Sequence, residues 1–291
     1  MTAQSNLKAA LWMGGSIASF LVMSVAGRAV MPPLDVFQVM EMRSIIGLLF
    51  LLPVVLASGG FAAMRTQRPW QHIGRNVVHY GGQYAWLLAL TMIPLAELIS
   101  IEFTTPIWGA LLAMIFLGER LSGRKVMAIA LGLIGVLVIV RPGIEKADPG
   151  HLVMLAGAVA FGISIVMVKS LTRTESVVRI IFWMMVIQSV IGLVPAYQVW
   201  QNPPPELWPW IVVIAFTGMS SHFCMARALS HAEAMIVMPM DFSRLPLSAL
   251  LGWVAYNEGI DTYTVIGAAL ILGGNLFNLQ RRGKAVATEQ A

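Results

Sequence analysis

Seven ionisable side chains stand inside stretches of the chain that are otherwise apolar, and these side chains are the first candidates for chemistry. They are Glu41, Arg43, Glu97, Glu102, Arg227, Asp241 and Arg244. At the centre of a membrane-spanning helix an ionisable group costs at least about 2.5 to 3.5 kcal/mol on insertion scales, so such a group is a functional candidate by default.

Asp241 and Arg244 are three residues apart, which places them on one face of a helix and within reach of each other. One interpretation is a pair that merely neutralises itself. The other is that Arg244 anchors a substrate carboxylate, phosphate or carbonyl, with Asp241 as its alternative partner.

Glu102 has two interpretations as well. It could carry a coupling proton or bind a substrate amine, or it could form a structural pair with Arg43 of another helix. Glu41 and Arg43 are two residues apart and do not face each other on a helix, so they do not simply cancel. Glu97 and Glu233 stand near helix starts, where a carboxylate complements the helix dipole, and we expect a structural role for both.

A polar stripe is expected on the third apolar segment, because Tyr80, Gln83 and Tyr84 follow a spacing of three and four residues. The equivalent segment of the second half carries His222. These groups suit a substrate with a planar or ring portion, although tyrosines also form interfacial belts. The predicted substrate contacts are therefore Arg244, Asp241, Glu102, Tyr80, Gln83, Tyr84, His222 and Arg43.

The composition shows what must position these residues. Hydrophobic residues make up 58% of the 291 residues and charged residues 11%, with a mean hydropathy of +0.77, whereas soluble domains carry about 25% charged residues. We predict an all-α, polytopic membrane protein with ten transmembrane helices of about 20 residues each. The expected segments are 9–30, 36–58, 77–93, 95–117, 124–140, 151–169, 178–200, 207–229, 232–256 and 262–280.

The basic residues indicate topology rather than a nucleic-acid partner, despite a net charge of +5. Thirteen Lys and Arg lie in alternate connections and tails, against three, namely Arg28, Arg141 and Lys146, in the others. The positive-inside rule then predicts cytoplasmic N- and C-termini in the inner membrane. The first segment could also be read as a secretory signal ending near Ala26, but its apolar run is longer than a usual signal core.

The two halves of the sequence resemble each other. A shift of 139 residues aligns the segment that starts at Phe103 with the one that starts at Phe242, and Glu119 with Glu258. This predicts two five-helix repeats, 1–142 and 143–291, of opposite orientation, as in secondary transporters with a substrate site between the halves. Pro106 and Pro246 predict a break near the midplane in both repeats.

The stretch Gly118-Glu119-Arg120-Leu121, followed by Gly132, Gly135 and Arg141-Pro142-Gly143, resembles the EamA repeat of the drug/metabolite transporter superfamily. The second half, with Asn257-Glu258 and Gly273-Gly274, is similar but has no basic residue directly after Glu258. The resemblance implies ten helices, cytoplasmic termini and transport of a small metabolite, without naming it.

The sequence therefore predicts a secondary transporter with alternating access, not an enzyme. An amino acid or derivative is the first substrate expectation, and a flavin or nucleobase-type ring compound is the second. An intramembrane serine enzyme built on Ser220 or Ser221, or a channel, is a weaker alternative. Expected partners are the substrate, the lipid bilayer and a proton as candidate coupling ion, with no cofactor, metal or nucleic acid, in a monomer or homodimer.

Overall fold

The computed structural model consists of helices joined by turns and short connections in the part of the chain it describes, which comprises residues 6–31, 33–117, 123–141, 148–171, 174–231, 237 and 240–279. The first half contributes α1 (Asn6–Val30), α2 (Val36–Ala57), the short α3 (Gly60–Ala63), α4 (Pro69–Leu90), α5 (Leu95–Glu102), α6 (Thr105–Leu117) and α7 (Gly123–Val140). The second half contributes α8 (Pro149–Leu171), α9 (Val177–Gln198), the 3-10 turn η1 (Pro205–Leu207), α10 (Trp208–His231), α12 (Arg244–Tyr256) and α13 (Thr262–Leu279).

Several of these helices can cross a membrane. By length and hydropathy, α1, α2, α8, α9 and α10 qualify, and α7 and α13 contain shorter apolar stretches. The prediction of an all-helical multi-pass membrane protein is confirmed, while the number of ten spans stays a prediction. Residues of the sequence argument that lie outside the described ranges are 118–121, Pro142, Gly143, Lys146, Arg173, Glu233, Arg281, Arg282 and Lys284.

The third segment begins earlier than expected, at Pro69 rather than near residue 77. Proline fits the first turn of a helix because that turn needs no backbone donor. The added turns carry polar side chains that are buried against α8, where Arg75 Nε donates to Ser164 Oγ at 3.0 Å. Because of these partners, the helix includes polar residues that precede the start predicted from hydropathy alone.

Both repeats break where the prolines predict. In the first, residues 103–104 form a turn between α5 and α6, and Thr104 Oγ1 donates to the carbonyl of Ile101 at 2.6 Å. In the second, residues 242–243 form the turn directly before α12. The two turns are 139 residues apart, so the broken helix belongs to the repeat rather than to one copy.

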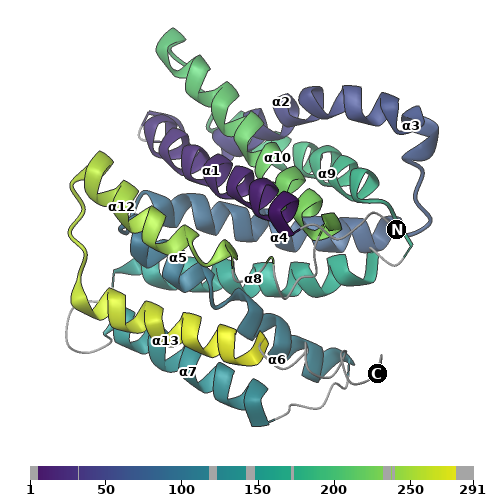
Figure 1. Cartoon of the computed structure of the whole chain (residues 1–291). Helices are drawn as coiled ribbons and strands as arrows, with labels where there is room; N and C mark the ends of the chain where they lie inside the picture. The colour runs from purple at the N-terminus through teal and green to yellow at the C-terminus, as the bar shows by residue number, and fades with distance from the viewer. Residues whose placement is uncertain are drawn as a thin grey trace.

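Figure 1 shows how the two halves combine, because α1 lies beside α10, α2 beside α9, α4 beside α8, and α7 beside α13. Each of these pairs joins a helix of the first half to one of the second. In the last pair the backbones touch: a Cβ on Gly135 would lie 2.6 Å from the carbonyl oxygen of Gly267, and the reverse holds too. Helix α1 begins and α13 ends on the same side of the bundle (Figure 1).

Candidate functional site

The buried guanidinium of Arg244, at the start of α12, lies between two carboxylates. Its Nη2 is 3.0 Å from Glu102 Oε1 and 3.5 Å from Asp241 Oδ2. Asp241 and Arg244 therefore do pair, as their spacing suggested, but Glu102 is the closer partner. The two acids are 139 residues apart and so occupy equivalent positions of the two repeats. Glu102 and Asp241 both reach Arg244 because the breaks in the two repeats lie next to each other.

Aromatic rings enclose this group. The guanidinium carbon of Arg244 is 4.2 Å from the ring centre of Phe20 and 4.9 Å from that of Phe103. Trp86 Nε1 donates a hydrogen bond of 2.7 Å to Glu102 Oε2. We call Phe20, Trp86, Glu102, Phe103, Asp241 and Arg244 the arginine cage. It draws on α1, α4, α5, α12 and the residues just before α12, and thus on both repeats.

The cage is held by ring contacts, one between two of its members and one from Phe103 to the neighbouring Phe242. Phe20 and Trp86 meet edge to face at 5.4 Å, and so do Phe103 and Phe242. The second contact joins the two broken turns directly, because Phe103 and Phe242 are the equivalent residues of the two repeats. Edge-to-face packing is a favoured geometry for aromatic pairs, so the breaks are fixed against each other.

The chemistry of the cage follows from its charges. Two carboxylates and one guanidinium give the cage a formal charge of −1, and aromatic faces attract organic cations. The cage can therefore accept an ammonium or sulfonium group, while Arg244 can hold a carboxylate in two parallel hydrogen bonds. A molecule with both groups satisfies both kinds of partner.

No ion pair joins Arg43 to Glu102 in the part of the chain that the structure describes; Glu102 does pair with an arginine of another helix, but that arginine is Arg244. The functional and the structural interpretation of Glu102 both stay predictions. Arg43 instead faces α10, where its Cδ would lie 3.7 Å from a Cβ on Gly218. One turn further along α10 is His222, which interacts electrostatically with Arg43, Arg75 and Arg244. The predicted residues Arg43 and His222 thus share one region of α10, and neither belongs to the contacts that Arg244 makes with Glu102 and Asp241.

The expected polar stripe of α4 points in two directions. Tyr80 and Gln83 are buried, and among the described residues neither Tyr80 Oη nor Gln83 Oε1 has a hydrogen-bond partner. Tyr84 is only half-buried and stacks on Phe37 of α2 with ring centres 4.4 Å apart. Tyr84 is therefore held in a stacked aromatic pair, and Tyr80 and Gln83 are the members with free polar atoms.

The serines considered as nucleophiles bind helices together. Ser220 Oγ donates to Ser19 Oγ at 2.9 Å. Ser16 Oγ donates to the carbonyl of Ser221 at 2.9 Å, and Ser221 Oγ returns a bond to the carbonyl of Ser16 at 3.1 Å. These bonds tie α10 to α1 and give the hydroxyls a structural role.

A group of polar contacts around Arg28 and Glu258, at one end of the bundle, was not predicted from the sequence; we call it the lock. Arg28, near the end of α1, donates to the carbonyls of Leu90 (3.0 Å) and Ile93 (2.9 Å) and forms an ion pair with Glu258. Glu258 also accepts the backbone N–H of Leu95 at 2.9 Å. The available signal was the alignment of Glu258 with Glu119, which marks it as a residue of the repeat pattern.

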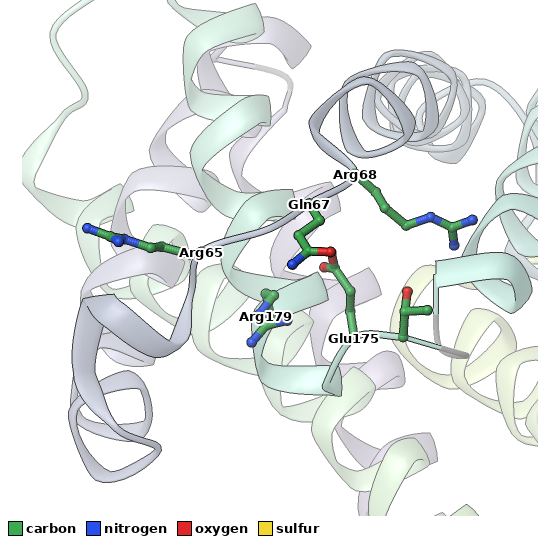
Figure 2. A pocket seen from close by; sticks show the side chains of 6 residues that line it. Arg65, Gln67, Arg68, Glu175 and Arg179 are labelled. Atoms are coloured by element: carbon green, nitrogen blue, oxygen red, sulfur yellow. The ribbon is translucent and has the colours of Figure 1, made fainter.

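A surface pocket of about 460 Å³ lies at the opposite end, where the connection from α3 to α4 meets that from α8 to α9. It is lined by Arg65, Gln67, Arg68, Thr174, Glu175 and Arg179. Figure 2 shows Arg65 and Arg68 extending in opposite directions from their connection. Glu175 is engaged by Thr66 and by His72, whose Nε2 is 2.6 Å away. The pocket lies between connections rather than inside the helix bundle, so it is not the expected central site.

The residues that the sequence argument missed are mostly aromatic. Phe20 and Phe103 lie in apolar runs where a phenylalanine carries no functional signal, although Phe103 had been aligned with Phe242. No group of three or more His, Cys, Asp or Glu side chains arranged to hold a metal ion occurs in the part of the chain that the structure describes.

Comparison with known proteins gives a consistent result. The model of the EamA-like transporter family matches residues 7–141 and again 148–280. The chain is 33% identical over 231 residues to a riboflavin transporter of Rhizobium johnstonii, covering 79% of this chain and 76% of that one. It is 26% identical over 276 residues to an S-adenosylmethionine uptake transporter of Rickettsia felis, covering 95% and 94%. A solved crystal structure has a similar fold, with a TM-score of 0.66, 20% identity, and coverage of 96% of this chain and 99% of that one.

Proposed function

Because this chain belongs to the EamA-like transporter family, we propose that it is a secondary transporter that carries an amino acid or amino acid derivative across the inner membrane by alternating access. Its named relatives are transporters of small molecules and not enzymes, which makes it a small-molecule transporter of a multi-pass membrane type. The excess of basic residues in alternate connections supports cytoplasmic termini.

The observation that carries the proposal is the arginine cage. Arg244 is shared by two equivalent carboxylates at the point where the broken helices of both repeats meet, which is where transporters with inverted repeats place their substrates. Asp241 is the more distant of the two acids, at 3.5 Å against 3.0 Å for Glu102. A substrate ammonium would therefore take Asp241, while Arg244 keeps Glu102 and turns a free donor to the substrate carboxylate.

The remaining predicted contacts surround this exchange. Arg43 and His222 would face the anionic side of the substrate from α2 and α10. Tyr80 and Gln83 would offer their free polar atoms, and Tyr84 its ring.

A flavin-type ring compound is the second candidate. It is favoured by the rings of Phe20, Trp86 and Phe103 around the cage and by the similarity to a riboflavin transporter. Ring stacking would then matter more than the charges of Glu102 and Asp241.

The test is a thermal-shift measurement on purified protein with methionine, S-adenosylmethionine and riboflavin as separate probes. Binding to the folded form stabilises it by about 2.7 kcal/mol at a ligand concentration 100 times Kd. We expect S-adenosylmethionine or methionine to raise the unfolding temperature of the wild type and of Arg65→Ala, an exposed arginine, but not of Arg244→Lys. A shift with riboflavin alone would favour the second candidate. A shift that survives Arg244→Lys would refute the cage as the binding site.

A further inference from the structure

Glu41 is a buried carboxyl group in α2 that differs from the other acids of the bundle. Its residue is 2% exposed, and among the described residues its Oε2 has no hydrogen-bond partner. An ionised carboxylate in such a place would lose its hydration without compensation, whereas a protonated carboxyl is neutral. The arrangement seen here is therefore one that holds Glu41 in its protonated form.

The other acids inside the bundle have cations or imidazoles beside them. Glu102 and Asp241 share Arg244, Glu97 lies 2.6 Å from His151 Nε2, and Glu175 and Glu258 are paired with His72 and Arg28. No Lys, Arg or His nitrogen of the described ranges is recorded within ion-pair distance of Glu41. The role of proton carrier, which the sequence allowed for Glu102, is better suited to Glu41, because Glu102 is occupied by Arg244 and Trp86.

Glu41 also lies at a contact between the two repeats. Helix α2 packs along α9, and a Cβ on Gly192 of α9 would collide with Glu41 Oε2 and lie 2.9 Å from Tyr80 Oη. The equivalent glycine of α2, Gly47, faces Met185 of α9 in return. The burial of Oε2 thus depends on α9 staying against α2.

We infer that Glu41 is the proton-binding site of this transporter, holding a proton while Gly192 covers it and releasing it to water when the two repeats move apart. This inference rests on the proposed function, because alternating access is what separates the repeats. On release the carboxyl O–H bond breaks and water takes the proton. On uptake, water reached from the other side of the membrane returns it.

The groups around Glu41 fit this role. From α4, Tyr80 places a phenol beside it, and from α9 comes Gly192. Two charged residues of the α2 region also reach this neighbourhood, because Arg43 and Asp35 both interact electrostatically with Tyr80; Arg43 lies against α10 near Gly218, and no ion pair joins it to Glu41 among the described residues. The side chains in direct contact with Glu41 carry no formal charge. Binding or release of a proton by Glu41 therefore changes the net charge at this place.

The first test needs no substrate. We expect the infrared spectrum of the purified wild type at neutral pH to contain the carbonyl stretch of a protonated carboxylic acid. The band should be absent in Glu41→Gln and present in Glu206→Gln, which alters an exposed carboxyl. Circular dichroism would show that Glu41→Gln is folded. In a folded Gly192→Ala variant the band should shift, because a methyl group crowds Oε2. A wild type without the band, or a band that persists in Glu41→Gln, would overturn the inference.

The second test uses proteoliposomes with riboflavin and S-adenosylmethionine as probes. An imposed proton gradient should stimulate wild-type uptake, and Glu41→Gln should lose this stimulation while keeping exchange of labelled for unlabelled probe. Stimulation that persists in Glu41→Gln, or a wild type that transports but ignores the gradient, would refute proton binding at Glu41 as the coupling step. If the wild type moves neither probe, the proposed function fails for these two compounds, and the infrared band alone upholds or overturns the proton site.

Discussion

The cage makes a quantitative prediction about stability, because its central cation serves two buried acids. Replacing Arg244 by methionine keeps most of the side-chain volume but leaves Glu102 and Asp241 close together without a cation. Removing one partner of a buried ion pair typically costs about 3 to 5 kcal/mol, since the other charge stays uncompensated. We expect a loss of this size for Arg244→Met.

Neutralising the acids at the same time should recover part of that loss. In the triple variant Arg244→Met, Glu102→Gln, Asp241→Asn, no charge is stranded, and the side-chain carbonyl of the introduced glutamine can still accept the hydrogen bond from Trp86. What remains lost is the attraction of the guanidinium to Phe20 and Phe103, about 0.5 to 2 kcal/mol per ring. For two rings this loss is about 1 to 4 kcal/mol, against about 3 to 5 kcal/mol for the single variant, so the triple variant should be more stable than the single one by about 1 to 2 kcal/mol.

Thermal unfolding in one detergent, followed by far-UV circular dichroism, would compare the three proteins. The expected order of midpoints is wild type, triple variant, single variant. If Arg244→Met unfolds at the wild-type temperature, or if the triple variant is the least stable of the three, then Arg244 does not neutralise these two acids and the charge assignment of the cage is incorrect.

Two further predictions concern parts of the bundle away from the cage. Gly135→Ala should destabilise the protein by about 1 to 3 kcal/mol, because its methyl group would enter the backbone of α13. Gly273→Ala, with open space at its Cβ position, should unfold at the wild-type temperature in the same assay, and equal effects would contradict the close helix contact. Glu258→Gln should cost about 1.5 to 3 kcal/mol through its weakened bonds to Arg28 and the backbone. The exposed Glu206→Gln is its control in the same melts, and no difference between the two would argue against the lock.

Much of the fold could be predicted from hydropathy and prolines. The predicted segments 36–58, 178–200 and 262–280 match helices that end within two residues of the expected bounds, because long apolar runs have few alternatives to a helix in a bilayer. Pro106 and Pro246 predicted both breaks because the effect of a proline on its own helix is also local. The start of α4 escaped prediction because Arg75 and its neighbours are polar, and only their burial against α8 explains why the helix includes them.

The partners inside the site could not be predicted in the same way. The spacing of Asp241 and Arg244 indicated their pairing, which is a local contact within one short segment. Whether Glu102 would meet Arg43 or Arg244 depends on how α5 is rotated about its axis, and sequence spacing carries no information about the facing helix. The aromatic members escaped for a related reason, since Phe20 differs from other apolar residues of α1 only in what packs against it.

The arginine cage has one further property, which concerns symmetry. Glu102 and Asp241 are equivalent residues, as are Phe103 and Phe242, yet Arg244 corresponds to Thr105 and has no second copy. Two copies of one repeat thus surround a centre whose arginine occurs in only one of them. In the proposed binding mode, turning a bound molecule end over end would exchange its arginine contact for a threonine, which favours one orientation of the molecule. In the proposed transport cycle, a cargo held in that one orientation would leave with opposite ends leading on the two sides of the membrane.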